Sequence, residues 1–595
     1  MSSPHRPTRR EFICSASVLA AGLPRVLAGL STRPPVPLSE FGYGDVSLTS
    51  ELHERQFHET HAVLMQLDED SLLKPLRQMS GQPAPGDDLG GWYHFDPEFR
   101  LPDNFVGFAP GCNFGQWVSA LARSYAITGD QATRDKVLRL NRLYAKTITG
   151  DFYENNRFPT YSYDKLVCGL IDAHQFAGDP DALSILDHTT DTALPHFPRA
   201  AVEHGRPWRS NRDETWTWDE SYTISENLFL AYQRGAGERY RALGQQYLDD
   251  EYFGPLAEGR NNLAGRHAYS YVNALSSAMQ AYLTLGSEKH LRAAKNAFAM
   301  LSQQSFVTGG WGPNETLGSD LALSLAGTHN SFETPCGSYA HFKLTRYLLR
   351  VTRDSRYGDS MERVMYNTVL GAKPLQADGR HFYYSDYNFK GHKFYKDVGW
   401  ACCSGTLPQV AADYRINTYF RDPDGVYVNL YIPSTLRCKQ VSLTQTSAYP
   451  SEGHVQFDVT ASQGTECALR FRIPEWADGA SLSVNGRRVT APVIPGAFAS
   501  IRRLWRTGDR VEVNLPMTMR LQAVDPRHPD IVALLYGPLV LFAITDSPPA
   551  VTRRQLLAAR KIGAQQWQVE TAGGPLRMVP FTAIADEQYS TYLET

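Results

Sequence analysis

Residues 113–148 read NFGQWVSALARSYAITGDQATRDKVLRLNRLYAKTI, and the pair Gly129-Asp130 divides this stretch into two halves. Apolar residues recur three and four positions apart in both halves, which is the spacing of an amphipathic helix. Gly ends a helix and Asp caps the next one, so the stretch predicts two helices, over 113–128 and 133–148, joined by a tight turn. A connection this short makes the two helices antiparallel neighbours.

The same pattern extends from about residue 50 to residue 420. Further helical segments are predicted at 51–66, 163–177, 182–196, 218–233, 237–250, 268–285, 289–302, 336–352, 356–371 and 405–418. Every second segment of the series carries a long apolar run, such as Leu-Val-Cys-Gly-Leu-Ile at 166–171, which suits an inner layer buried on most sides. Six helical hairpins either close into a ring, the (α/α)6 barrel, or stack as an open solenoid. No repeat of fixed period is visible, which favours the closed barrel.

After about residue 420 the pattern changes from helices to strands. Apolar and polar residues alternate through 426–432, 454–459 and 469–473, and period-two alternation indicates half-buried strands. Many short strands at this spacing predict one or more antiparallel β-sandwich domains. The expected organisation is therefore a signal segment at 1–31, an (α/α)6 catalytic barrel at 40–420 and β-sandwich domains at 421–595.

The first residues have the parts of an export signal in the usual order. Arg9-Arg10 precede Glu11-Phe12-Ile13 and a short apolar stretch that runs to Val26-Leu27-Ala28. The paired arginines resemble a twin-arginine signal, and the alternative is a tail in which two arginines fall together by chance. The apolar stretch is too short to span a membrane, and no later segment is long enough. We therefore expect a periplasmic or extracellular protein without a membrane span.

Composition and charge argue against a nucleic-acid-binding protein and against a small disulfide-rich protein. Lys and Arg number 59 against 62 Asp and Glu, so the clustered positive charge that a nucleic-acid partner requires is not indicated. The aromatic share of 11% suits sugar rings and ordinary cores equally well. Eight cysteines are too few for a disulfide scaffold, so their positions matter more than their number.

Three cysteines and two glutamates fall in loops that precede or enter predicted helices. They are Glu315, Glu333, Cys336, Cys402 and Cys403. Loops that feed helix N-termini meet at one end of an α/α ring, and a helix N-terminus favours the thiolate form of a nearby cysteine. Three thiols and one carboxylate suffice for a tetrahedral zinc site. Spacing alone leaves open the alternative of three buried, inert thiols.

From about residue 45 to residue 545 the chain resembles the β-L-arabinofuranosidase family, glycoside hydrolase family 127. The most specific matches are Glu333-Thr-Pro-Cys336 and Ala401-Cys402-Cys403. Weaker matches are GGW at 90–92, SALARSYAITGD at 119–130, LRFRIPEW at 469–476, SVNG at 483–486 and YGPLV at 536–540. The resemblance implies an (α/α)6 barrel that carries the active site, followed by β-sandwiches.

The resemblance also implies one zinc ion held by one Glu and three Cys. Carried over to this chain, the ligands are Glu315, Cys336, Cys402 and Cys403. Cys402 is the implied nucleophile and Glu315 the implied general acid/base, with Glu333 as a supporting or competing carboxylate. The implied activity is that of a retaining exo-glycoside hydrolase that releases a terminal pentofuranose-type sugar from a plant-type glycan or oligosaccharide.

Two alternatives stay open at this point. A polysaccharide lyase on the same helical toroid would need Arg or Lys facing a uronate carboxylate. A non-catalytic carbohydrate-binding protein would use the zinc only to tie loops together. If the zinc of an enzyme is purely structural, another pair of carboxylates must perform the chemistry, and Asp219-Glu220 and Asp386 are the candidates.

The chain departs from the family pattern in two places that bear on the site. Pro335 is inserted between Glu-Thr and Cys, so the turn differs and Glu333 is free to point elsewhere. Gln116 and Asp164 stand near positions where characterised members carry histidines, whereas His267 keeps a third. The altered hydrogen-bond donors and charges bear on which sugar is recognised.

The expected substrate-binding residues combine these positions with two aromatic residues. They are His267, Gln116, Asp164, Trp92 and Tyr384. Trp92 either stacks on a sugar face or plugs a gap between domains. Tyr384 either lines the cleft or belongs to an ordinary pair of strands.

Overall fold

The computed structural model describes residues 37–595 with the exception of 100–104, 204–218, 319, 326–328 and 463. The expected signal at 1–31 lies outside the described residues. Residues 38–595 belong to one unit, to which the following description applies. Within the described part of the chain, no helix combines the length and the apolar character needed to cross a membrane.

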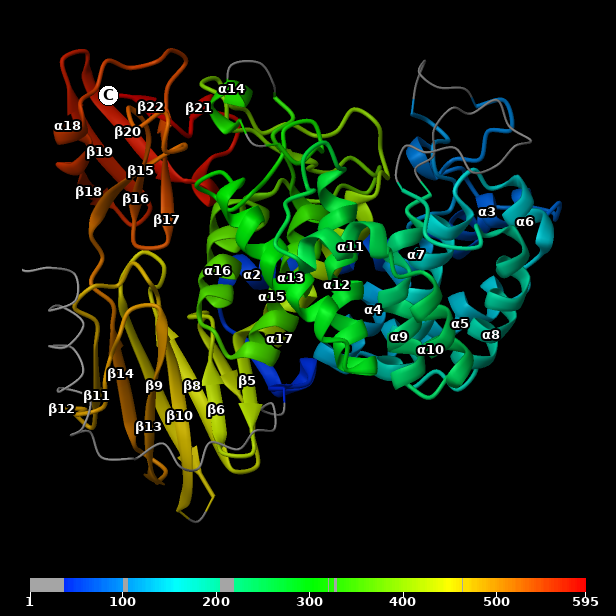
Figure 1. Ribbon diagram of the computed structural model, residues 1–595, viewed down its shortest axis with the longest axis horizontal. Coiled ribbons are helices and arrows are strands. Elements are labelled where there is room, and N and C mark those ends of the chain that lie inside the picture. Colours follow the sequence, from blue (N-terminus) through cyan, green and yellow to red (C-terminus); the bar gives the residue numbers. More distant parts are fainter. Residues whose placement is uncertain (1–36, 100–104, 204–218, 319, 326–328, 463) are drawn as a thin grey trace, which may run out of the picture. The chain divides into compact units, whose positions relative to one another are not determined.

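Six helices form a closed inner ring in which each helix packs against the next and the last packs against the first. In order they are α4 (Phe114–Thr128), α7 (Pro159–Asp172), α9 (Ser225–Gln233), α12 (Ala268–Leu285), α15 (Thr334–Thr352) and α17 (Cys403–Thr418). These are the segments with long apolar runs; every residue of α17, for example, is buried. The structure thus confirms the (α/α)6 barrel and its predicted inner layer (Figure 1).

Six further helices cover the ring from outside, each against one inner helix. They are α2 (Glu51–Gln66), α5 (Gln131–Tyr144), α8 (Ala182–Ala193), α10 (Glu238–Gln246), α13 (Glu288–Gln303) and α16 (Arg356–Asn367). The expected turn between α4 and α5 is present. Gly129 is left-handed with φ of 70°, and the Asp130 carboxylate accepts a hydrogen bond from the Thr133 backbone N–H at 2.9 Å.

Helices α4 and α7 touch backbone to backbone through two glycines. A Cβ atom on Gly115 would lie 2.0 Å from the backbone oxygen of Lys165, and one on Gly169 would lie 2.4 Å from the oxygen of Gly115. Any larger residue would push the helices apart, because the obstacle in both cases is backbone. The close approach fixes the first turn of α4 against the second half of α7.

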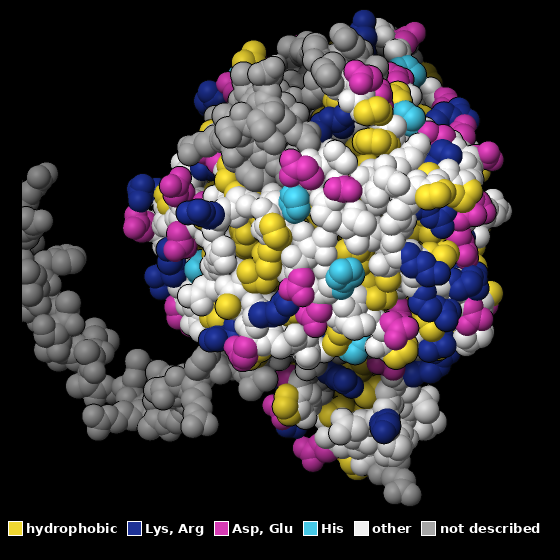
Figure 2. Space-filling model, turned by 90° about the vertical axis from the view of Figure 1, so that its right-hand side faces the viewer, with side chains coloured by type: hydrophobic (Ala, Val, Ile, Leu, Met, Phe, Trp, Pro, Cys, Tyr) yellow, Lys and Arg dark blue, Asp and Glu magenta, His cyan; other side chains and the backbone are white. Residues whose placement is uncertain are grey.

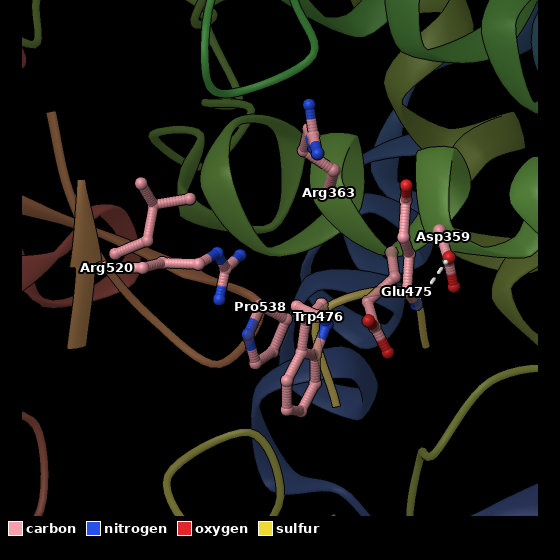
Figure 3. A pocket seen from close by; sticks show the side chains of 8 residues that line it. Asp359, Arg363, Glu475, Trp476, Arg520 and Pro538 are labelled. Atoms are coloured by element: carbon pink, nitrogen blue, oxygen red, sulfur yellow. Dashed lines mark hydrogen bonds between the residues drawn. The ribbon is translucent and has the colours of Figure 1, made fainter. Parts of the chain in front are cut away.

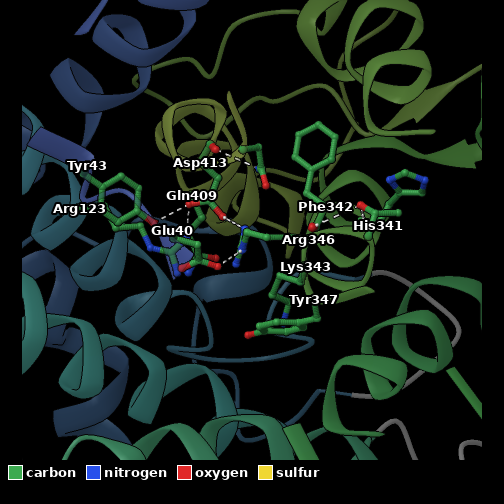
Figure 4. A network of polar contacts seen from close by, with 12 residues as sticks. Glu40, Tyr43, Arg123, His341, Phe342, Lys343, Arg346, Tyr347, Gln409 and Asp413 are labelled. Carbon is green, nitrogen blue, oxygen red and sulfur yellow. Dashed lines mark hydrogen bonds and ion pairs between the residues drawn. The ribbon is translucent and has the colours of Figure 1, made fainter. Parts of the chain in front are cut away.

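A buried network of ion pairs links three inner helices to the N-terminal segment (Figure 4). Asp413 of α17 accepts from Arg123 of α4 at 2.9 Å and pairs with Arg346 of α15 at 3.3 Å. Arg346 also pairs with Glu40 at 3.0 Å, and Glu40 belongs to the short strand β1 (Ser39–Glu40). Loss of one partner would remove part of the compensation of a buried charge, so the network favours one arrangement of these elements.

Two sheets pack face to face after the barrel. One has the order β1–β5–β6–β10–β13 and the other β12–β11–β14–β9–β8–β7–β2. The bounds are β2 (Val46–Leu48), β5 (Tyr419–Asp422), β6 (Gly425–Val428), β7 (Ser434–Leu436), β8 (Val441–Ser447), β9 (His454–Ala461), β10 (Thr465–Ile473), β11 (Ser481–Val484), β12 (Arg487–Arg488), β13 (Ala497–Trp505) and β14 (Arg510–Asn514). Phe457 and Phe471 meet between the sheets with ring centroids 5.0 Å apart. The predicted β-sandwich is confirmed, although β6 and β10 pair in parallel.

Each sheet of the sandwich contains a strand from before the barrel. Ser39 of β1 lies opposite Arg421 of β5, and Val46 of β2 lies opposite Leu436 of β7. Residues 519–594 then form a third sheet with the order β15–β16–β17–β20–β19–β18 and two short added strands, β21 and β22. Its bounds are β15 (Met519–Ala523), β16 (Ile531–Tyr536), β17 (Leu539–Ile544), β18 (Arg560–Gly563), β19 (Gln566–Thr571), β20 (Gly574–Pro580), β21 (Tyr589–Ser590) and β22 (Leu593–Glu594).

The surface carries charges of both signs. Figure 2 shows Lys and Arg interspersed with Asp and Glu over the coloured part of one face of the molecule. This distribution agrees with the near balance of 59 basic and 62 acidic residues. It provides no extended single-sign field of the kind that steers a polyanion to a protein, over the residues that are coloured there.

Acid is expected to destabilise the fold in part through His53, which is buried on α2 between Tyr366 and Tyr414. Burial, and then the charge of Arg415, lowers the pKa of His53 to about 3. As the pH falls below 6.5, His53 therefore binds a proton in the unfolded chain but not in the folded chain. This contribution to the free energy of unfolding is fully retained above pH 6.5 and decreases as the pH falls below that value. At pH 5 the loss is about 2 kcal/mol.

Thermal unfolding of the His53→Gln variant between pH 7 and pH 5 measures this contribution. The Tm of the variant should fall less steeply with pH than that of the parent protein. His58→Gln, on the exposed side of the same helix, serves as the matched control and should keep the parent slope. Equal slopes for His53→Gln and the parent would contradict the assignment.

Candidate active site

One cavity lies where loops enter the inner helices of the barrel. Phe158, His267, Glu333 and Cys402 line it, and they are the residues immediately before α7, α12, α15 and α17. The remaining lining residues are Trp92, Phe108, Tyr161, Glu220, Tyr269, Glu315 and Tyr383. The structure therefore brings together at one end of the ring the loops that the sequence placed before helices.

Three thiols and one carboxylate meet beside this cavity, and two of the four residues, Glu333 and Cys402, line it. The Sγ atom of Cys402 lies 3.2 Å from Oε1 of Glu333, and the Sγ atom of Cys403 lies 3.7 Å from the same oxygen. The Sγ atoms of Cys403 and Cys336 are 3.4 Å apart. All four side chains are buried, and one ligand atom from each lies within 4.8 Å of the others.

This donor set fits a tetrahedral zinc ion. Ligands at ~2.0–2.3 Å from a tetrahedral ion lie roughly 3.5–4 Å from one another, close to the separations found here. The second carboxylate oxygen of Glu333, Oε2, is buried and accepts no hydrogen bond within the described part of the chain. A buried carboxylate oxygen without a donor is costly unless a cation compensates it.

The insertion of Pro335 does not turn Glu333 away from the cysteines, as the sequence had suggested it could. Pro335 lies in the first turn of α15, where a missing N–H costs nothing. Glu333 immediately precedes that helix and ends the short strand β3 (Phe332–Glu333), in which it lies opposite Tyr384 of β4 (Tyr384–Ser385). The proline thus fits the start of the helix and leaves Glu333 directed at Cys402.

The glutamate beside the thiols in the structure is Glu333, whereas Glu315 lies in a second group with His267 and Glu333. Oε2 of Glu315 lies 3.3 Å from Nε2 of His267, and Oε1 of Glu315 accepts a short hydrogen bond from the Tyr384 hydroxyl. His267 also approaches Glu220 at 3.4 Å and Glu333 at 3.9 Å. The backbone of Glu315 is left-handed, with φ of 56°.

The environment separates the pKa values of these groups. Burial raises the pKa of Glu333 well above its usual range, and the neighbouring charge of Cys402 adds to the effect. Burial also opposes ionisation of Glu315, but the hydrogen bond and charge of His267 outweigh it and lower the pKa of Glu315. For His267, burial is outweighed by Glu220 and Glu315, so the pKa of the imidazole is raised. His267 can therefore carry a proton beside Glu315.

Cys402 differs from Cys336 and Cys403 in that its pKa is lowered, whereas theirs are raised. Burial opposes its ionisation, but hydrogen bonds from Cys336 and Cys403 and the charge of Lys165 lower the pKa of Cys402 well below its usual range. The Tyr383 hydroxyl lies 3.4 Å from its sulfur. Cys402 is thus the thiol on which negative charge is most favoured, and it is the cysteine that lines the cavity.

Helix α4 anchors the loop that carries Cys402. The amide of Asn113 donates to the backbone oxygens of Trp400 at 2.8 Å and Ala401 at 3.2 Å. The indole N–H of Trp117 donates to the backbone oxygen of Ser404 at 3.1 Å. These bonds hold the two residues before Cys402 and one after Cys403, and so fix both thiols.

Trp92 reaches the cavity because its loop packs on the loop of the cysteines. The Trp92 backbone N–H donates to Gly399 O at 3.0 Å, and a Cβ atom on the left-handed Gly91 would lie 2.0 Å from that same oxygen. The Trp92 ring contacts Phe108 at 4.6 Å. Its indole N–H is buried and donates to no acceptor among the residues that the structure describes.

Two of the expected substrate-binding residues lie behind the cavity wall instead of lining it. Gln116 contacts Gln409 at 3.4 Å and Lys165 at 3.5 Å, and Asp164 accepts from Asn227 at 2.8 Å. Neither Gln116 nor Asp164 is among the residues that line the cavity. His267 and Trp92 do line it, and the Tyr384 hydroxyl donates a hydrogen bond to Glu315, which also lines it.

The reason for the displacement of Asp164 is helical geometry. Residues four apart share a face of α7, and here that face carries Tyr161 and Lys165, whose ammonium lies 4.3 Å from the Tyr161 ring centroid. Tyr161, which lines the cavity, and Lys165 beside it were not predicted from the sequence as site residues. The spacing of Tyr161 and Lys165 was the signal that could have identified them.

The alternative catalytic carboxylates occupy different places. Asp219 caps α7, since its Oδ1 accepts from the backbone N–H groups of Thr160 at 2.8 Å and Tyr161 at 3.1 Å. Asp386 is fully buried and pairs with His329. Of the three candidates, Glu220 alone lines the cavity.

Comparison with known protein structures gives the same architecture. The crystal structure of Ara127N-Se, a GH127 β-L-arabinofuranosidase from Geobacillus stearothermophilus T6, superposes with a TM-score of 0.71 at 18% identity, over 92% of this chain and 99% of that one. The GH127 β-arabinofuranosidase BT3674 gives a TM-score of 0.71 at 18% identity, over 94% of this chain and 98% of that one. At identities this low, the structural similarity establishes the fold alone.

Family profiles carry the assignment further. No curated protein sequence matches the chain. The profile described as Beta-L-arabinofuranosidase, GH127 catalytic domain, matches residues 45–415, and the profile of the GH127 middle domain matches residues 425–517. Because the catalytic-domain profile covers most of the chain, the protein belongs to the GH127 β-L-arabinofuranosidase family and is a glycoside hydrolase.

Proposed function

We propose that the protein is a retaining exo-glycosidase in which Cys402 is the nucleophile and Glu315 the general acid/base, with one zinc ion held by Glu333, Cys336, Cys402 and Cys403. The observation that carries the proposal is the meeting of a three-thiol, one-carboxylate donor set with a second, separate glutamate in one cavity. A bound zinc ion supplies a charge that keeps coordinated thiols deprotonated.

The two steps follow from the positions of the side chains. The Cys402 sulfur attacks the anomeric carbon while the Glu315 carboxyl gives its proton to the departing glycosidic oxygen. A water molecule then displaces the sulfur from the sugar, with Glu315 taking the proton of the water. Two displacements at one carbon retain its configuration.

Two neighbouring side chains, His267 and Tyr384, can donate hydrogen bonds to the Glu315 carboxylate. His267 lies 3.3 Å from Oε2 of Glu315, and its raised pKa keeps a proton available there. Tyr384 donates to the other oxygen and fixes the orientation of the carboxyl group. Tyr383, 3.4 Å from the Cys402 sulfur, favours the thiolate both before attack and on departure.

We further propose a terminal pentofuranoside, β-L-arabinofuranoside-like, as the substrate. Six of the eleven residues that line the cavity are aromatic, and the other five are Glu220, His267, Glu315, Glu333 and Cys402. Aromatic faces together with hydrogen-bonding groups suit one small sugar ring at the end of a glycan. The unpartnered indole N–H of Trp92 offers a donor for a sugar hydroxyl. Among the described lining residues there is no Arg or Lys to hold a uronate, so no observation favours the lyase alternative.

For location, we propose export through the twin-arginine-type signal at Arg9-Arg10. Such a route fits a protein whose metal site draws on residues far apart in the sequence, because the route carries folded proteins. A fusion of residues 1–36 to a reporter enzyme, with Arg9-Arg10 changed to Lys-Lys as the control, tests this part independently.

Elemental analysis tests the metal assignment directly. Protein purified without chelator should contain about one zinc per chain. Removal of the zinc should abolish hydrolysis of an aryl β-L-arabinofuranoside and lower the Tm, because the ion ties together the loops before α15 and α17. Zinc content below a tenth of an ion per chain in active protein would overturn the proposal.

A further inference from the structure

A second cavity, of about 170 Å³, lies between α16, the segment after β10 and the strand β15. It shares no lining residue with the active-site cavity. Its wall includes Asp359, Glu362 and Arg363 of α16, Glu475 and Trp476 after β10, and Arg520 of β15 (Figure 3). Trp476 and Glu475 belong to the LRFRIPEW motif at 469–476, and no residue of this motif lines the active-site cavity.

Two guanidinium groups line this cavity without an acceptor. Arg520 and Arg363 make no side-chain hydrogen bond or ion pair within the described part of the chain, and Nη1 of Arg520 is buried. Burial and then the charge of Arg363 lower the pKa of Arg520 to about 10. Two nearby positive charges of this kind are stabilised by an anion between them.

The acidic residues of the same wall are already compensated. Arg472 pairs with Asp359 and, at 2.6 Å, with Glu362, while Glu362 also accepts from the Tyr449 hydroxyl at 2.6 Å. Asp359 accepts from the backbone N–H of Glu475 at 3.0 Å. These bonds occupy Asp359 and Glu362, so neither carboxylate forms an ion pair with Arg363 or Arg520 within the described part of the chain. The charges of Glu362 and of the exposed Glu475 still act on Arg520 from a greater distance.

Trp476 adds an apolar surface and one more free donor. Its indole N–H is buried and has no acceptor among the described residues, and its ring lies 5.9 Å from the Arg520 guanidinium carbon. Figure 3 shows Arg520 extending toward Trp476 and Pro538, with Glu475 and Asp359 on the other side of the indole. A cavity of roughly 150 Å³ accommodates one six-membered ring, so the size suits a single sugar residue.

We propose that this cavity binds one uronate residue of a glycan, with its carboxylate between Arg363 and Arg520, its ring against Trp476 and its hydroxyl groups near Glu475. Guanidinium groups recognise carboxylates by paired hydrogen bonds, and a sugar ring stacks on an indole. The site would hold acidic glycan while the neutral terminal sugar occupies the catalytic cavity. The inference rests on this cavity alone and not on the proposed nucleophile.

Binding to the full-length Cys402→Ser protein tests the proposal without turnover. Titration calorimetry would compare methyl β-D-glucuronide and methyl α-D-galacturonide with the corresponding neutral glucoside and galactoside, and with acetate. We expect at least one uronide to bind at least tenfold more tightly than its neutral counterpart and than acetate. Its affinity should fall several-fold between 50 and 300 mM salt, because the pairing is ionic.

Substitutions locate the site. Arg520→Gln and Arg363→Gln should each weaken uronide binding tenfold or more while leaving aryl arabinofuranoside hydrolysis unchanged in the otherwise unmodified enzyme. Arg577→Gln, an exposed arginine on β20, is the matched control and should change neither. Equal binding of uronide and neutral glycoside, equal binding of acetate, or full uronide affinity in folded Arg520→Gln would each overturn the proposal. Circular dichroism establishes folding, and if Arg520→Gln does not fold, Arg363→Gln decides.

Discussion

The Cys402→Ser variant is expected to lose three or more orders of magnitude in kcat/KM on an aryl β-L-arabinofuranoside. A serine hydroxyl at this position lacks the low pKa that the surroundings give the Cys402 thiol, so the attacking group is neutral. Removal of a nucleophile commonly costs about this much or more. Initial rates with the purified variant, measured alongside its zinc content and its Tm, give the comparison.

The matched control is Cys467→Ser, a buried thiol on β10 outside the cavity, which should retain the parent activity. Mass spectrometry of the parent enzyme, quenched with a slow substrate, should show a pentosyl adduct on the peptide that contains Cys402. The first-formed sugar should have the anomeric configuration of the substrate by NMR. Parent activity in folded Cys402→Ser, or an inverted product, would refute the nucleophile assignment.

Glu315→Gln is expected to lower kcat/KM by roughly 10²–10⁴, because a positioned acid contributes about that factor. The loss should be smaller for aryl leaving groups of low pKa, which depart without a proton. Zinc content should stay at the parent level, because Glu315 is held by His267 and Tyr384 and not by the cysteines. Kinetics over a series of leaving groups and elemental analysis measure the two effects separately.

Glu333→Gln is the matched comparison for Glu315→Gln. It removes the carboxylate beside Cys402 and Cys403, so zinc is expected to fall together with activity, whatever the leaving group. The opposite result, with zinc lost from Glu315→Gln and kept by Glu333→Gln, would restore the ligand set expected from the sequence and refute the arrangement proposed from the structure.

The architecture could be predicted from the sequence because buried segments have a characteristic pattern of apolar residues. Continuous apolar runs distinguished the inner helices from the outer ones, and alternation identified the strands of the sandwich. The strands β1 and β2 were not predicted, because Ser39–Glu40 and Val46–Leu48 are too short to show a period. Their partners, near Arg421 and Leu436, lie beyond the whole barrel.

The site was predictable in its residue types but not in its pairings. Spacing and resemblance selected the three cysteines and both glutamates, yet the choice between Glu315 and Glu333 depended on backbone geometry. Glu333 lies beside Cys402 and Cys403, whereas Glu315 contacts His267 and Tyr384, and neither set of contacts can be read from spacing along the chain. Asp164 was selected because it stands near a position where the family carries a histidine. One position along a helix rotates a side chain by about 100°, and it is Lys165 that lies over the Tyr161 ring.

The early strands of the sandwich have a consequence for biosynthesis. Glu40 leaves the ribosome long before its partner Phe420, a delay of tens of seconds at ~5–20 residues per second. During that time the barrel helices emerge while Ser39–Glu40 and Val46–Leu48 have no strand to pair with. Both sheets of the sandwich can therefore be completed only after the whole barrel and the strands that follow it have been made. For the same reason the isolated sandwich would lack one strand from each of its two sheets.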